Sequence, residues 1–125
     1  MLMHRDKPVK MDPDVKEKWC EALESGQYRQ GRAYLNRGEH FCCWGVLCEV
    51  LKVPHSALYK SPGGNLDVVA YEGATTLPTP AILKQAGLET AYFEVDIEGN
   101  LQTLQVHNDA GHGFLRIAKA IRENL

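Results

Sequence analysis

The most constraining feature of the chain is an apolar segment that carries three of its four cysteines. It runs from Phe41 to Leu51 and reads FCCWGVLCEVL. Eleven residues are long for a buried strand, and Pro54 ends the segment cleanly. As a helix it is apolar on nearly its whole circumference, which is typical of a helix inside a protein core. We therefore predict a central, buried helix around which the other elements pack.

A glycine inside this predicted helix indicates a close contact. Gly45 makes the helix about 1 kcal/mol less stable than alanine would. A position without a side chain also lets a second segment approach closely. The sequence thus predicts that a neighbouring backbone packs against the helix at Gly45.

Composition and charge predict a globular protein of ordinary type. The chain has 125 residues, 44% of them apolar and 24% charged, which suits one domain over residues 1–125 with a polar leader at residues 1–11. A formal net charge of -2 argues against a general nucleic-acid surface. No apolar run reaches the roughly 18 residues of a membrane span, and the first residues are too polar for a secretory signal. We expect a cytoplasmic protein without nucleic-acid or membrane partners.

Helix signals flank the central segment on both sides. Asp12-Pro13 and Thr79-Pro80 each combine a capping residue with proline at the first helical position. Glycines at positions 26 and 87 end these two helices. A last amphipathic helix carries apolar residues at Phe114, Ile117, Ala118, Ile121 and Leu125.

Short strands complete the predicted α+β fold. Residues 66–71 and 92–97 have strand patterns, and Leu101–Val106 can return beside the latter, although Leu104–His107 fits a helical turn equally well. His55–Tyr59 is predicted as a turn, and Tyr34-Leu35 is expected to pair with His40-Phe41 in a hairpin. We therefore predict a buried central helix, flanking N- and C-terminal helices and a small antiparallel sheet from residues 66–71 and 91–106.

The cysteines are best interpreted as free thiols. Cys42 and Cys43 are adjacent and Cys48 lies on the same predicted helix, so disulfides among them have poor geometry. No Cys-x-x-Cys or His-x-x-x-His spacing occurs, and we expect neither a bound metal nor a cofactor.

A thiol site is one hypothesis for function. Cys42 and Cys43 fall in the first turn of the central helix, where backbone N–H groups stabilise a thiolate. His107, on a later segment, is the candidate base for a cysteine-dependent hydrolase or transferase. The alternative is that both thiols are small core residues, which is the commonest role of cysteine.

A ligand site is the second hypothesis. Asn108, Asp109 and Gly111 precede the last helix, whose N-terminus is a natural binding place for anions. Arginines from a separate segment, residues 29–37, are expected at its rim: Arg29 and Arg32 around Gln30, and Arg37. The alternatives are a plain turn at residues 108–111, since Asn and Asp favour turns, and a solvated arginine loop. A helix-turn-helix over residues 104–125 and a protein-protein adaptor are weaker interpretations.

Several motifs together resemble a known protein family. They are, in chain order, Trp19-x-x-Ala22-Leu23-x-Ser25-Gly26-x-Tyr28-x-Gln30-Gly31, Phe41-Cys42-Cys43-x-Gly45-Val46-Leu47-Cys48, Leu77-Pro78, Gly87-Leu88 and Asn108-Asp109-x-Gly111-x-x-Phe114-x-x-Ile117-Ala118-x-x-Ile121. This order resembles an uncharacterised family of small bacteriophage and bacterial proteins. That family typically has leucine in place of Trp44 and does not always have a histidine before the Asn-Asp pair. The resemblance implies a structural or ligand-binding role for Asn108 and Asp109 rather than catalysis by His107.

A binding domain of unassigned function is the leading interpretation. Its ligand would be a small acidic or nucleotide-like molecule or a host protein, bound where the central helix start meets Asn108 and Asp109. By analogy, a phage setting implies a role such as sequestering a nucleotide signal of host defence. The alternative is the cysteine-dependent enzyme that uses Cys43 or Cys42 with His107.

Overall fold

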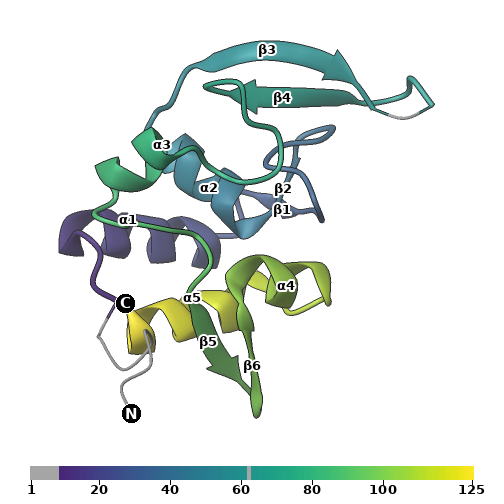
Figure 1. Ribbon diagram of the computed structural model, residues 1–125. Coiled ribbons are helices and arrows are strands. Elements are labelled where there is room, and N and C mark those ends of the chain that lie inside the picture. The colour runs from purple at the N-terminus through teal and green to yellow at the C-terminus, as the bar shows by residue number, and fades with distance from the viewer. Residues whose placement is uncertain (1–8, 62) are drawn as a thin grey trace.

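The computed structural model describes residues 9–61 and 63–125, which form five helices and six short strands (Figure 1). This arrangement confirms the predicted α+β class. The elements in chain order are α1 (Pro13–Glu24), β1 (Arg29–Gln30), β2 (His40–Phe41), α2 (Cys43–Val50), β3 (His55–Lys60), β4 (Asp67–Tyr71), α3 (Pro80–Gln85), β5 (Glu94–Ile97), β6 (Asn100–Thr103), α4 (Leu104–Asp109) and α5 (Phe114–Asn124).

Helix α2 lies at the centre of the core, as predicted. Every residue from Cys43 to Cys48 is buried, and Figure 1 shows α2 above α1, with α3 beside its upper end. The Trp19 indole of α1 donates a hydrogen bond to the Cys43 carbonyl (2.9 Å), and its ring lies 5.0 Å from that of Trp44. The helix begins later than predicted, because His40 and Phe41 pair with β1 and are therefore extended.

Gly45 confirms the predicted close approach of another backbone. A Cβ at this position would lie only 1.7 Å from the Leu35 carbonyl oxygen and 2.6 Å from the carbon. The segment before β2 therefore crosses α2 at van der Waals distance from its backbone. Any side chain at position 45 has to displace that segment or the helix.

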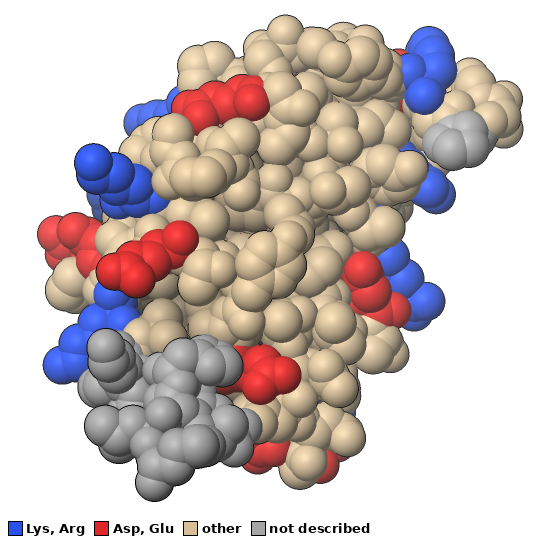
Figure 2. Space-filling model, in the orientation of Figure 1, with Lys and Arg blue, Asp and Glu red and all other residues tan. Residues whose placement is uncertain are grey.

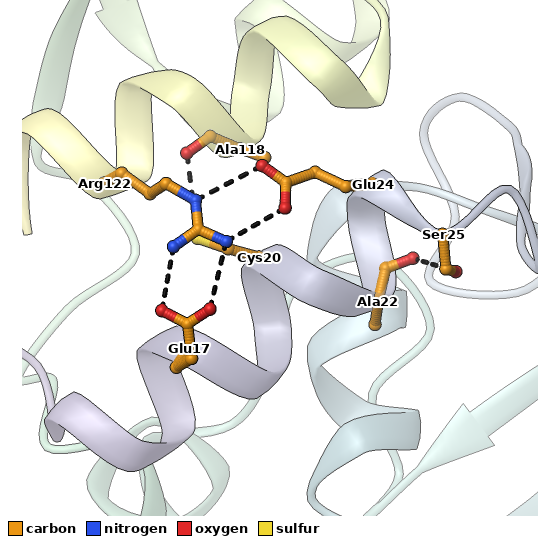
Figure 3. Close-up of polar contacts among 7 residues, drawn as sticks. All are labelled: Glu17, Cys20, Ala22, Glu24, Ser25, Ala118 and Arg122. Carbon is orange, nitrogen blue, oxygen red and sulfur yellow. Dashed lines mark hydrogen bonds and ion pairs between the residues drawn. The ribbon is translucent and has the colours of Figure 1, made fainter.

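Helices α1 and α5 pack side by side and are joined at the surface by Arg122. Its guanidinium donates to Glu17 (2.8 and 3.2 Å) and to Glu24 (2.9 and 3.2 Å), which lie about two helical turns apart on α1 (Figure 3). These bonds lower the pKa of both carboxyl groups. Beneath the Arg122 guanidinium, the buried Cys20 thiol lies 3.7 Å from the Ala118 carbonyl oxygen of α5. The first and last helices thus form one layer of the core.

The strands form three separate two-stranded sheets rather than one small sheet. β3 pairs with β4 and β5 with β6, both antiparallel, while β1 and β2 are parallel. The turn predicted at residues 55–59 is wrong, because these residues pair with β4 as strand β3. Figure 1 shows the β3–β4 hairpin projecting past α2, and the β5–β6 hairpin on the far side of the molecule beside α5.

Hydrogen bonding decides two local predictions, the structure of residues 104–107 and the hairpin at residues 34–41. After β6 the chain turns into α4, with the Thr103 hydroxyl accepting from the Val106 N–H, so the helical alternative for Leu104–His107 is the one observed. The hairpin predicted between residues 34–35 and 40–41 is not formed. Instead, a tight turn joins Arg37 to His40, and β2 runs parallel to β1.

The start of the described chain takes part in the core. Met11 is buried, Val9 packs against the core, and the Asp12 N–H donates to the Ala86 carbonyl (2.8 Å). Residues 1–8 of the predicted leader lie outside the described residues. No helix among the described residues is both long and apolar enough to span a membrane. On the face shown in Figure 2, side chains of both charge signs lie around the rim, and the centre carries few of either.

We expect Gly45→Ala to lower the free energy of unfolding by about 3 kcal/mol or more, because overpacking against a backbone cannot be relieved by a rotamer change. Intrinsic helix propensity alone would favour alanine by about 1 kcal/mol, so the sign of the change tests the contact. Urea denaturation gives the value. Gly113→Ser is the control, since a Cβ at that position would meet no atom within 4 Å and the φ of Gly113 is -68°.

A Gly45→Ala protein as stable as the unmodified chain would contradict the close packing of residue 35 on α2.

Candidate functional site

The side-chain amide of Asn108 connects three segments, α4, the start of α2 and residues 30–31, at the centre of the predicted ligand site. Its Oδ1 accepts from the Gln30 amide (3.0 Å) and from the Cys43 backbone N–H (3.1 Å). Its Nδ2 donates to the Gly31 carbonyl (2.8 Å) and to Asp109 Oδ1 (3.1 Å). These four bonds use the full hydrogen-bonding capacity of an asparagine side chain. Asn108 is also 1% exposed, so its amide serves the protein interior.

One of these bonds caps α2 from another part of the chain. The N-cap residue of α2 is Cys42, whose side chain forms no capping hydrogen bond. Asn108, 65 residues away in sequence from Cys43, supplies the missing acceptor to the first N–H of the helix. This contact fixes the position of α4 relative to the buried helix.

Asp109 stabilises the loop that follows β1. Its Oδ1 accepts from the Ala33 N–H (2.9 Å), and the Gln105 amide donates to both carboxylate oxygens (3.2 and 3.3 Å). Ala33 has a φ of 69°, a conformation that L-residues rarely adopt. The carboxylate therefore offsets the cost of an unusual backbone conformation next to Arg32.

The turn between α4 and α5 is tied to the same centre. The Gln30 amide, besides contacting Asn108, donates to the His112 carbonyl (2.8 Å). Gly111 has a φ of 99°, which favours glycine, and Arg32 Nη2 lies 3.4 Å from the place where its Cβ would be. The structure thus brings Gln30, Asn108 and Asp109 together and sets Arg32 beside Gly111. Arg29 is exposed on β1 and forms no ion pair with any other described residue.

A groove of about 720 Å³ opens next to this turn, and we name it the α5 groove. It is lined by Leu23, Glu24, Gly26, Tyr28, Gln30, Gly111, Gly113, Phe114, Leu115 and Arg116. The first residues of α5 form part of the wall of this groove. Gly113, the N-cap of α5, has no side chain to satisfy the first N–H groups of the helix.

Comparison with known families places the whole described core in one group. Residues 11–125 match the family described as Domain of unknown function (DUF8296). The chain belongs to this family. No curated protein and no solved structure matches it. The DUF8296 match includes every residue that contacts Asn108, so the hydrogen-bonded centre lies within the family domain.

The thiols of this DUF8296 chain are buried and protonated. Cys20, Cys42, Cys43 and Cys48 are free and fully buried. Burial raises the pKa of Cys20 and Cys42 to about 11 and that of Cys48 to about 12, and it raises the pKa of Cys43 well above its usual range. The Cys43 Sγ lies 3.8 Å from the Leu104 carbonyl oxygen. These environments favour the thiol over the nucleophilic thiolate.

His107 is oriented by a different part of the core. It is 1% exposed, and its Nε2 lies 2.8 Å from the Val95 carbonyl oxygen of β5, so this nitrogen carries a proton and donates. Among the described residues, no hydrogen bond joins His107 to Cys42 or Cys43. This geometry gives no support to the cysteine-dependent alternative. Nor do three His, Cys, Asp or Glu side chains within residues 9–61 and 63–125 converge on a possible metal site.

A second polar cluster was not predicted from the sequence. Glu49 Oε2 accepts from the Tyr71 hydroxyl (2.6 Å) and lies 2.9 Å from His55 Nε2, while the Asn36 amide donates to the Tyr71 hydroxyl (3.2 Å). Burial, followed by the bond to Glu49, raises the pKa of Tyr71. A groove of about 530 Å³ adjoins this cluster. These four residues have no regular spacing in the sequence that would indicate a cluster. In addition, residues 55–59 were predicted as a turn, so the strand that positions His55 was missed.

We expect Asn108→Ala to lower the free energy of unfolding by about 3 to 5 kcal/mol, because it leaves the buried Cys43 N–H and Gly31 carbonyl without partners. Asn108→Asp keeps both acceptor contacts but loses the donor and adds charge beside Asp109, so it should also destabilise. Urea denaturation measures both. The control is Asn65→Ala on an exposed loop, which should change stability by no more than about 0.5 kcal/mol.

A stable Asn108→Ala protein would show that the amide does not hold these segments together.

We also expect native thiols to resist iodoacetamide between pH 6 and pH 9, counted by mass spectrometry. With folded pKa values of about 11 to 12 for three of them, raising the pH to 9 produces little thiolate. All four should react in concentrated urea, where burial is removed and the ordinary pKa of about 8.5 returns. Rapid labelling of Cys42 or Cys43 in the native chain near pH 6 would contradict this and support the enzyme alternative.

Proposed function

We propose that this chain is a non-enzymatic binding domain for a small acidic molecule, held in the α5 groove. The observation that carries the proposal is the uncapped N-terminus of α5 at that groove. In α1, α3 and α4 a side chain from Asp12, Thr79 or Thr103 caps the first turn, and Asn108 caps α2. Among the described helices, α5 alone lacks such an acceptor. A bound anion would supply it.

Positive charge near the groove supports an acidic ligand. The Arg32 guanidinium lies beside Gly111, and neither Arg32 nor Arg29 forms an ion pair with another described residue. Arg116 also lines the groove, although it is paired with Glu98. Glu24, the acidic residue of the lining, is paired with Arg122, which it shares with Glu17. The helix dipole of α5 adds a partial positive charge of about half an elementary charge.

Apolar surface in the same groove supports a ligand with an organic part. Tyr28 is half-buried in edge-to-face contact with Phe41, and Leu115 is 69% exposed. A planar group, such as a nucleobase, would pack against these side chains while its phosphate reached the start of α5. The resemblance of the sequence to phage-encoded proteins makes a nucleotide signal the first ligand to test.

The groove is formed by segments that are already fixed. Gln30 is held by Asn108 and by the His112 carbonyl, and Gly31 by Asn108. Binding to a preformed site does not require these segments to be ordered again, which favours affinity. In this proposal Asn108 and Asp109 support the site, and the arginines and the α5 backbone contact the ligand.

The test is isothermal titration calorimetry with inorganic phosphate, mononucleotides, dinucleotides and cyclic dinucleotides. Gly113→Asp places a carboxylate at the N-cap, where it competes with any bound anion and stabilises the helix by a few tenths of a kcal/mol. We expect it, and Arg32→Gln, to weaken nucleotide binding at least about 10-fold, a change of about 1.4 kcal/mol. Gln102→Glu adds the same charge on β6 outside the groove and is the matched control.

The proposal fails if none of these molecules binds, or if Gly113→Asp binds them as tightly as Gln102→Glu does.

A further inference from the structure

The end of α1 brings an unbalanced negative charge to the wall of the α5 groove. Glu24, the last residue of α1, lines the groove, and Arg122 of α5 pairs with it (2.9 Å) and with Glu17 (2.8 Å) (Figure 3). The hydrogen bonds from Arg122 lower the pKa of both carboxyl groups, so both are ionised at neutral pH. Because two carboxylates share one guanidinium, the three side chains together carry one net negative charge.

The backbone of α1 adds to this charge at the same place. The C-terminus of a helix carries a partial negative charge, and the last turn of α1 contains no basic residue that would offset it. Gly26, two residues beyond the end of α1, also lines the groove. The lining therefore combines the positive end of one helix, α5, with the negative end of another, α1.

The cations near the groove balance one negative charge of a ligand and not two. Arg116 of the lining is paired with Glu98. Two arginines form no ion pair with a described residue. Of these, Arg32 lies beside Gly111 of the lining, whereas Arg29 is exposed on β1. A second charge on the ligand would therefore face the excess negative charge at Glu24 without a partner of its own.

The free donors at the start of α5 fit the same limit. The N–H groups of Phe114 and Leu115 have no acceptor within the part of the chain that the structure describes, and the next two N–H groups donate to the Gly113 carbonyl (3.1 Å each). A phosphodiester has two non-bridging oxygens that share one negative charge. It can accept both N–H bonds while Arg32 balances its charge. A phosphomonoester has three such oxygens and up to two charges.

We propose that Glu24 restricts the α5 groove to singly charged ligands, and that its ligand is a nucleotide phosphodiester rather than a phosphomonoester. This inference rests on the proposed function, since it names the class of ligand for the same groove. Glu24 acts here through its charge. It opposes a dianion about twice as strongly as a monoanion, because Coulomb energy is proportional to the charge of the ligand. The two hydrogen bonds from Arg122 hold its carboxylate in place.

The test is isothermal titration calorimetry of the full chain with adenosine 5′-monophosphate and with its methyl ester, adenosine 5′-methyl phosphate. At about pH 7.5 the monophosphate is almost fully doubly charged and the ester singly charged, while base and sugar are the same. We expect the ester to bind at least about 3-fold more tightly, which is the effect of one unbalanced carboxylate on a unit charge several ångströms away in water.

Glu24→Gln should abolish this preference, because the monophosphate then gains about 9-fold in affinity and the ester about 3-fold. Glu17→Gln should reduce the preference without changing the lining, since Arg122 then balances Glu24 alone. Glu89→Gln is the matched control: it removes one negative charge from an exposed residue outside the lining and should leave the ratio of the two dissociation constants unchanged. Circular dichroism verifies that each variant is folded.

Two different failures can be told apart. If neither probe binds, the proposed nucleotide site itself fails, and the charge restriction falls with it. If both probes bind but the monophosphate binds at least as tightly as the ester, the groove remains a ligand site and only the charge restriction is overturned. The same holds if Glu24→Gln leaves the ratio of the two dissociation constants unchanged.

Discussion

The hydrogen bonds of the Asn108 side chain hold the rest of the structure in place. They join α4 to the start of α2, to Gln30 and to Gly31, segments that are 65 to 78 residues away in sequence. Inside a protein these bonds are stronger than in water, and each partner left alone would be a costly buried polar group. The apolar surface of α2 drives the chain to collapse, but such contacts are not directional. The amide determines which way α4 and the β1 segment lie against α2.

Local signals in the sequence predict much of this fold. The burial of α2 follows from its apolar circumference, the contact at Gly45 from its missing side chain, and the start of α1 and α3 from Asp12-Pro13 and Thr79-Pro80. Strand β3 could not be predicted in this way. Five of its six residues are exposed, so it carries no alternating pattern, and its conformation depends on pairing with β4. The parallel pairing of β1 and β2 likewise depends on contacts far apart in sequence.

The candidate site shows the same limit. The sequence predicts correctly that Asn108, Asp109 and Gln30 converge near the start of α2, but not that the amide of Asn108 is consumed by internal contacts. For the thiols, two effects of opposite sign compete. The backbone N–H groups of Trp44 and Gly45 lower the pKa of Cys42, whereas burial raises it and prevails. The sequence shows the helix start but not the depth of burial, so the balance could not be judged from it.

The helices differ in how their N-termini are capped. A side-chain cap is worth about 1 kcal/mol, and four of the described helices have one. The exception is α5, whose N-cap Gly113 lies in an open groove, whereas Asn108 of α4 is fully buried. If stability alone determined residue 113, aspartate or serine would serve better at its φ of -68° and ψ of 161°. In the proposed function, the absent side chain leaves the first N–H groups of α5 for a ligand, and the Asn108 contacts hold the segments that line the groove.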